Sequence, residues 1–175
     1  GYIKTLDSNG EYFPQLIGSD GTRIVMSSHE GELHGTEPSL RSIIRSGHIA
    51  AQDERFWLQC FLDIATGILL LHRGGLLHRD LHPGNILLQD AQGHAVIIDF
   101  GLSLPAKEAS QHRYGDANAA PYWLHPQVYD GTLAPSIHSD LFSFGQILSR
   151  VMDTFVHLRG NSTLTHLAGV YTDLK

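Results

Sequence analysis

Apolar side chains with helical spacing dominate the middle of the chain. Between residues 53 and 72 they recur at steps of three and four, which places them on one face of a helix. These positions are Trp57, Cys60, Phe61, Ile64, Ile68 and Leu71. Two glycines follow at positions 74 and 75, and glycine is the usual residue after the last turn of a helix. The pattern predicts a helix over residues 53–72, opened by Gln52 or Asp53.

Shorter patterns precede this helix. Apolar and β-branched residues at 12–18 and 22–27 predict two strands, because Ser-Asp-Gly at 19–21 is typical of a turn. Thr36 then starts a helix signal, with a proline in the expected first turn, and Gly47 ends it. The N-terminal part is therefore expected to hold a hairpin and one short helix.

The C-terminal half predicts a hairpin, a long loop and a second helix. Residues 85–89 and 94–99 read as strands around a four-residue turn at 90–93. A loop of about thirty residues follows, and loops of that length are usually functional. A helix is expected to begin near Ser139, and because it is apolar on nearly all sides we expect it to be central and buried.

Composition narrows the class of protein. The 175 residues are 42% hydrophobic and 17% charged, which fits one globular domain or a large part of one. A net charge of −6 without a basic block argues against general nucleic-acid binding. A single cysteine, Cys60, excludes a disulfide scaffold and a zinc-finger array. The most apolar run, residues 61–71, is too short for a membrane span and contains Asp63.

Three side chains between the two helices carry the candidate chemistry. Asp80 and Asn85 lie in a polar loop, and Asp99 follows the second hairpin strand. Mg²⁺ binds carboxylate and amide oxygens together with phosphates, so Asn85 and Asp99 can converge on a metal from the two sides of the hairpin. Asp80 would then accept a proton from an attacking hydroxyl.

The motifs around these residues resemble those of the protein-kinase family. His78-Arg79-Asp80-Leu81 with Asn85, followed by Asp99-Phe100-Gly101, is similar to its catalytic and magnesium loops. The resemblance implies an α+β fold with a truncated small β lobe, residues 1–30, and a mainly α-helical large lobe, residues 31–175, incomplete at its C-terminus. It also implies ATP and Mg²⁺ as cofactors, a protein substrate, and a cytoplasmic location, alone or as the intracellular part of a larger protein.

The resemblance assigns a role to individual residues. Asp80 and His82 would face the transferred phosphate, and Asn85 and Asp99 would bind the metal. The adenine pocket would be formed by Met26, Ser27, Ser28 and Leu87.

Further residues would support this site. His78 would brace the loop, and Asp140 would hold its backbone. Phe100 and Gly101 complete the magnesium motif. Arg79 implies a long loop ordered by a paired phosphate, with Ser110 or Tyr114 as candidate acceptors.

Several positions depart from the family pattern. Gln127 stands where the family has a glutamate that closes the long loop, so we expect that end of the loop to be held less firmly. His82 replaces the lysine of serine/threonine kinases, and Ala120 replaces a threonine expected to bond the catalytic aspartate. Trp123 is closer to tyrosine kinases. The class of acceptor hydroxyl is therefore left open.

No G-x-G-x-x-G precedes a strand in this sequence, so we expect the 175-residue chain alone to phosphorylate poorly or not at all. Two other functions remain. One is a pseudokinase that binds partner proteins, favoured by Gln127 and His82. The other is a small-molecule kinase, since His82-Pro83-Gly84-Asn85 also resembles loops of choline-kinase-like and aminoglycoside-kinase-like enzymes.

Overall fold

The computed structural model forms two compact units, each described here by itself. It describes residues 11–14, 16–19, 24–26, 39–46, 54–154 and 166. The helix–hairpin unit consists of Gly1–Gly74 and Gly84–Asp99, and the loop–helix unit of Gly75–Pro83 and Phe100–Lys175. The expected boundary between the lobes, at residue 30, lies outside the described residues and stays a prediction.

Two short strands lie near the N-terminus of the helix–hairpin unit. They are β1, Leu16–Ser19, and β2, Ile24–Met26, paired antiparallel with Leu16 opposite Met26. Both predicted strands are thus confirmed, although β1 is shorter than residues 12–18. Ahead of it, the carbonyl of Tyr12 accepts a hydrogen bond of 3.0 Å from the amide of Ile97. Phe13 is only 1% exposed, so this stretch belongs to the core rather than to the first strand.

The short helix α2 runs over Leu40–Ser46. The side-chain oxygen of Ser39 accepts a hydrogen bond of 3.3 Å from the amide of Ser42, the position of an N-cap. The expected cap, Thr36, lies outside the described residues, and assigning the cap to it was wrong because Ser39 satisfies the first-turn amide. The helix end before Gly47 agrees with the prediction.

The long helix α3, Glu54–Arg73, confirms the clearest sequence prediction. All six apolar positions of its predicted face are buried. The amide of Gly74 donates to the carbonyl of Leu70 at 3.0 Å, and Gly75 has a φ of 73°, as expected of a glycine that ends a helix.

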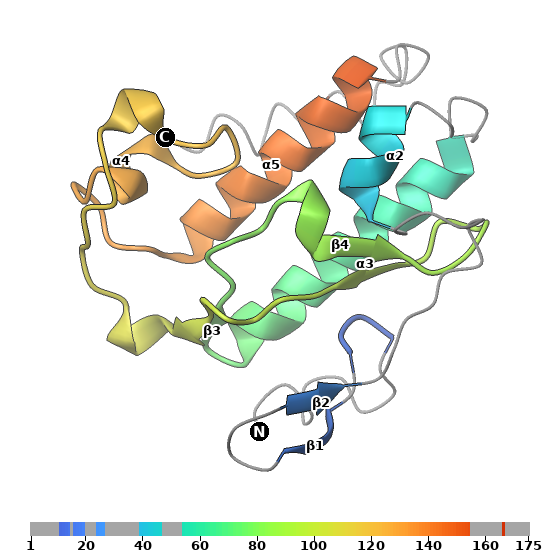
Figure 1. The fold of residues 1–175 in the computed structure, drawn as a ribbon, viewed down its shortest axis with the longest axis horizontal. Coiled ribbons are helices and arrows are strands. Elements are labelled where there is room, and N and C mark those ends of the chain that lie inside the picture. The colour runs from blue at the N-terminus through green and yellow to red at the C-terminus, as the bar shows by residue number, and fades with distance from the viewer. Residues whose placement is uncertain are drawn as a thin grey trace. The chain divides into compact units, whose positions relative to one another are not determined.

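The hairpin of strands β4, Ile86–Leu88, and β5, Ala95–Ile97, packs against α3, and α2 packs beside β4 (Figure 1). Its turn is held by the Asp90 carboxylate, which accepts from the amides of Gln92 and His94 at 3.0 and 3.1 Å. Gly93 has a φ of 94°, and a Cβ there would lie 2.3 Å from the carbonyl oxygen of Phe56. The turn is therefore seated directly on the backbone of α3.

The loop–helix unit begins with β3, Leu76–Leu77, which pairs with β6, Leu104–Pro105. The predicted long loop thus contains a strand, and it ends in the one-turn helix α4, Pro126–Tyr129. Helix α5, Ile137–Thr154, begins two residues before Ser139 and carries a buried apolar face. Its Phe142 is only half-buried and Ile137 is exposed, so burial on nearly all sides was wrong.

Candidate active site

Buried leucines fix the loop that carries Asp80. Leu77, in β3, and Leu81 are both 0% exposed, whereas the side chain of Asp80 is 27% exposed. Burial of the flanking leucines removes apolar surface from water and keeps the chain between them in place. The carboxylate of Asp80 therefore stays accessible on a fixed loop.

Asp140 holds the backbone of this loop. It lies in the first turn of α5 and is 1% exposed. Its two carboxylate oxygens accept hydrogen bonds of 2.9 Å from the amides of His78 and Arg79. Arg79 has a φ of 72°, in the left-handed region that costs a non-glycine residue about 1–2 kcal/mol. Charge-assisted bonds to a buried acceptor offset that cost, so Asp140 determines how the chain turns just before Asp80.

His78 links the loop to the segment that follows Asp99. Its ring is fully buried, and Nδ1 accepts from the amide of Asp80 at 3.3 Å. The hydroxyl of Ser103 donates to the His78 carbonyl at 3.3 Å, and the ring lies 5.2 Å from that of Phe100. Since Nδ1 is an acceptor within the loop, the imidazole braces the backbone.

His82 lies between Asp80 and an aromatic side chain. Its Nε2 is 3.7 Å from Oδ2 of Asp80, and its ring packs edge-on against Trp123 with centroids 5.0 Å apart. The carbonyl of Trp123 accepts a hydrogen bond of 2.5 Å from the hydroxyl of Ser143 in α5. The sequence did not predict this contact, because nothing in the pattern joins Trp123 to the loop.

The two expected metal ligands lie at the open end of one hairpin. Asn85 is buried and precedes β4, and its carbonyl accepts from the amide of Ile98 at 3.0 Å. Asp99 is the next residue after Ile98, is exposed, and has a φ of 61°. Non-glycine residues held in such conformations occur often at functional sites. An amide oxygen and a carboxylate are oxygen donors that suit Mg²⁺.

The expected adenine-pocket residues are only partly described. Met26 is the last residue of β2. Leu87 is half-buried in β4, pairs with Val96, and forms an isolated bridge to Ser39. Ser27 and Ser28 lie outside the described residues. Contact of this group with a nucleotide stays a prediction.

Asp63 supports the hairpin structurally, a role that the sequence analysis did not assign to it. It is a buried carboxylate in α3, and Oδ2 accepts from the amide of Ala95 and faces His94 Nδ1, both at 3.1 Å. Oδ1 accepts from the side-chain amide of Gln59 at 2.7 Å. Asp63 thus fixes to α3 the hairpin that ends at Asp99. The sequence does contain a signal for this role, because Asp63 is a single acidic residue among the apolar residues of α3 between Cys60 and Gly67.

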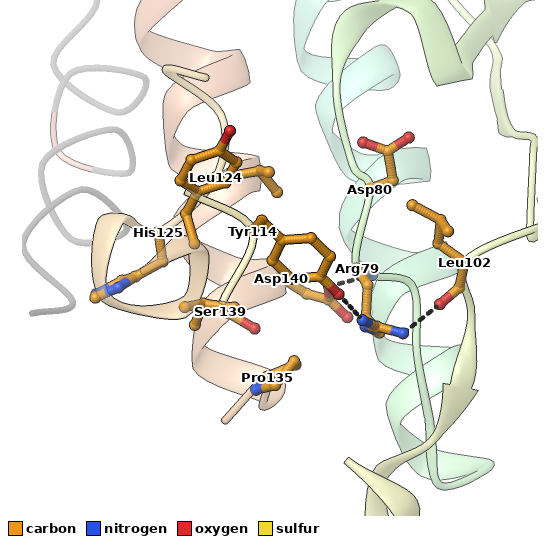
Figure 2. Close-up of a pocket in the computed structure, with 11 residues that line it drawn as sticks. Arg79, Asp80, Leu102, Tyr114, Leu124, His125, Pro135, Ser139 and Asp140 are labelled. Atoms are coloured by element: carbon orange, nitrogen blue, oxygen red, sulfur yellow. Dashed lines mark hydrogen bonds between the residues drawn. The ribbon is translucent and has the colours of Figure 1, made fainter. Parts of the chain in front are cut away.

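The side chain of Arg79 reaches the long loop. Its Nη1 donates to the carbonyl of Leu102 at 3.1 Å, and Nη2 is hydrogen-bonded to the hydroxyl of Tyr114 (Figure 2). Asp80 follows directly in the chain, so the residue before the candidate base holds two points of the loop.

A cavity of about 130 Å³ lies beside these residues within the loop–helix unit. Its lining is mainly apolar and includes Leu124, Val128 and Pro135. His125 also lines it and is 8% exposed, and its Nδ1 has no hydrogen-bond partner among the described residues. Burial lowers the pKa of His125, an effect that the nearby charge of Asp130 opposes.

Comparison with known proteins decides the family. The model of the protein kinase domain matches residues 24–172. The chain belongs to the protein kinase family. It is 31% identical over 132 residues to dual specificity testis-specific protein kinase 1 of Rattus norvegicus, covering 71% of this chain and 21% of that protein.

Other kinases match over shorter stretches. The chain is 42% identical over 110 residues to CBL-interacting protein kinase 8 of Oryza sativa subsp. japonica, covering 61% of this chain and 23% of that kinase. It is 35% identical over 86 residues to serine/threonine-protein kinase RUNKEL of Arabidopsis thaliana, covering 49% of this chain and 6% of that kinase. The chain thus spans less than a quarter of the length of each of these relatives.

We name the loop around Asp80 the catalytic loop and the segment from Asp99 to Gln127 the activation segment after the kinase motifs that they carry, and the roles of their residues stay a prediction. The Gln127 side chain is exposed, and the main-chain carbonyl of Gln127 accepts from the Thr132 hydroxyl at 3.1 Å and the Leu133 amide at 2.8 Å. Hydrogen bonds from the amide and hydroxyl of Thr132 lower the pKa of Asp130. Main-chain bonds and this turn therefore hold the end of the activation segment, while a looser hold by the Gln127 side chain stays a prediction.

The helices of the kinase domain carry polar residues along their length. Asp63 interrupts the apolar face of α3, and Asp140 that of α5. Within the part of the chain that the structure describes, no helix has both the length and the apolar character needed to cross a bilayer.

Proposed function

We propose that this protein is an active protein kinase that transfers the γ-phosphate of ATP to a protein hydroxyl. The observation that carries the proposal is the Asp80 loop, held by Asp140 through two amide hydrogen bonds of 2.9 Å with the Asp80 carboxylate accessible. A general base must be positioned before it can act, and that requires a fixed backbone. The protein-kinase family, to which the chain belongs, uses ATP and magnesium.

The roles follow from the chemistry of each side chain. Asp80 accepts the proton of the attacking hydroxyl. His82, at 3.7 Å, adds a polar group beside that carboxylate, in a position fixed by Trp123. Asn85 and Asp99 supply oxygen ligands for magnesium. Magnesium held by these two residues would neutralise the charge of the phosphate groups.

Replacing Asp80 by asparagine tests the proposal. In the natural full-length protein, Asp80→Asn should lower phosphate transfer roughly a hundredfold or more, since the amide cannot accept the proton. Transfer is measured from radiolabelled ATP to a basic protein acceptor and to a glutamate–tyrosine copolymer, which also shows the class of hydroxyl used. Asp116→Asn is the matched control, because Asp116 caps a short turn and asparagine caps equally well.

The outcomes separate the functions that the sequence left open. Transfer by the wild-type protein that falls only in Asp80→Asn supports a kinase. Binding of Mg·ATP without transfer to any acceptor would instead favour a partner-binding pseudokinase. The replacement of a family lysine by His82 and of a family glutamate by Gln127 also favours that alternative. Transfer to a small amino alcohol or aminoglycoside, but not to protein, would favour a small-molecule kinase.

The proposal includes a cytoplasmic location, because the reaction consumes cytosolic ATP and magnesium. Imaging of the natural protein carrying a fluorescent tag tests this part separately. A signal confined to a compartment without ATP would contradict it.

A further inference from the structure

Arg79 connects three segments of the loop–helix unit. Its amide donates to Asp140, its Nη1 to the carbonyl of Leu102 at 3.1 Å, and its Nη2 is bonded to the phenol of Tyr114. Figure 2 shows the guanidinium between the Leu102 carbonyl and the Tyr114 ring. Both oxygens that its side chain meets, the Leu102 carbonyl and the Tyr114 hydroxyl, are neutral.

Tyr114 is itself held in place by the end of α4. Its amide donates to the carbonyl of Tyr129 at 2.8 Å, and the two rings lie 6.1 Å apart at an interplanar angle of 25°. The amide of Gly115 also donates to that carbonyl, at 3.3 Å. A Cβ on Gly115 would come within 2.6 Å of the Tyr129 ring, so this approach requires glycine. The phenol is therefore presented to Arg79 by a backbone that is already fixed.

We propose that Tyr114, as an unmodified phenol, is a positioning residue that orders the activation segment against the catalytic loop. The proposal rests on the proposed kinase function and deepens it. It differs from the expectation that a phosphate pairs with Arg79, because the phenol already occupies that donor. The segment is then ordered without prior phosphorylation, and Asp80 is supported from the neighbouring residue.

Limited trypsin digestion tests the contact without depending on activity. Lys107 and Arg113 are exposed trypsin sites within the activation segment. In the natural protein, Tyr114→Phe removes only the phenolic oxygen and should speed cleavage at these sites about fivefold, as loss of one exposed charge-assisted bond predicts. Ser110→Ala removes another exposed hydroxyl of the segment and should leave the rate unchanged. Equal cleavage of Tyr114→Phe and wild type would overturn the proposal.

A double-mutant cycle shows whether Tyr114 acts through Arg79. If it does, Tyr114→Phe should add less than about 1.5-fold to the cleavage rate of an Arg79→Lys protein. Independent, multiplying effects would overturn the assignment. Phosphatase treatment of the wild type should leave its cleavage rate unchanged, and acceleration would show that a phosphate, not the phenol, holds the segment.

Kinetics connect the contact to the reaction. Tyr114→Phe should lower kcat/KM for the protein acceptor about fivefold and leave KM for ATP unchanged, because Arg79 directly precedes Asp80, the proposed base for the acceptor hydroxyl. A general loss of folding would change both. If the wild-type protein transfers no phosphate, the kinase function fails, while the digestion results still decide whether Tyr114 holds the segment.

Discussion

Asp63 is a single charged side chain that lies on the buried face of an otherwise apolar helix. It accepts two hydrogen bonds and faces an imidazole nitrogen, all within 3.1 Å. A buried carboxylate is tolerated when each oxygen has partners, and removing it leaves those donors unsatisfied.

We therefore expect Asp63→Ala to lower the free energy of unfolding by about 3 kcal/mol, because the amide of Ala95 and the side chain of Gln59 lose their acceptor. Urea unfolding followed by circular dichroism measures this. Glu108→Ala, which removes an exposed carboxylate, should change stability by less than about 0.5 kcal/mol. Similar losses in both variants would contradict a special role for Asp63.

The lowered pKa of His125 predicts that the stability of the protein depends on pH. Burial lowers its pKa in the folded protein, so the unfolded chain binds the proton more readily. Stability should then fall as pH drops below about 6.5, the ordinary value for histidine, and towards the folded pKa. His125→Phe keeps an aromatic ring at the position that packs 5.0 Å from Phe142. The free energy of unfolding of this variant should differ less between about pH 7.5 and pH 5.5 than that of the wild type. Exposed His138→Gln is the control, and an unchanged difference in His125→Phe would refute the prediction.

At the scale of elements, α3 and the β4–β5 hairpin were predictable, and their contact was not. The helical spacing determined which face of α3 is buried, and the turn residues determined the hairpin. The close approach of Gly93 to Phe56 depends on side chains and backbone brought together by folding. The same holds for β6, a two-residue strand whose pairing with β3 leaves no local pattern in the sequence.

Two glycines with positive φ allow the energetic cost of backbone strain to be distinguished from the cost of a steric clash. Gly93→Ala should lower the free energy of unfolding by about 3–5 kcal/mol, since the new Cβ meets the Phe56 carbonyl oxygen at 2.3 Å and φ is 94°. Gly75→Ala has nothing within 4 Å of its Cβ and should cost about 1 kcal/mol from its φ of 73° alone. Denaturant unfolding of both variants gives the comparison, and equal losses would show that packing on α3 contributes nothing.

At the scale of the whole molecule, the predicted site residues are divided between the two compact units. Asp80 belongs to the loop–helix unit, and Asn85 and Asp99 belong to the helix–hairpin unit. Motif spacing predicts all three residues from the sequence, because the chemistry of the protein-kinase family fixes the residue types and their order, and their roles stay a prediction. Arg79 was singled out too, but its link through Tyr114 could not be derived, because 35 residues separate the partners in the chain.

Magnesium-dependent nucleotide binding should depend on Asp99. In the natural protein, saturating Mg·ATP should raise the melting temperature by roughly 5 °C, and Asp99→Asn should reduce the increase to below about 1 °C by removing a charged ligand. Differential scanning fluorimetry measures the shift. Asp90→Asn makes the same change at the other end of the hairpin, where asparagine also suits the turn, and should keep the shift. A full shift in Asp99→Asn would exclude it as a metal ligand.

The carboxylate of Asp140 has a consequence for the order of events during synthesis. The two amides that it holds, at His78 and Arg79, precede it by 62 and 61 residues. A nascent polypeptide cannot complete this loop until Asp140 has left the ribosomal exit tunnel. A product that terminates before residue 140 lacks the carboxylate that accepts from the amide of Arg79. Translation stalled between these points would therefore yield a chain in which α3 can form while the turn before Asp80 is still unmade.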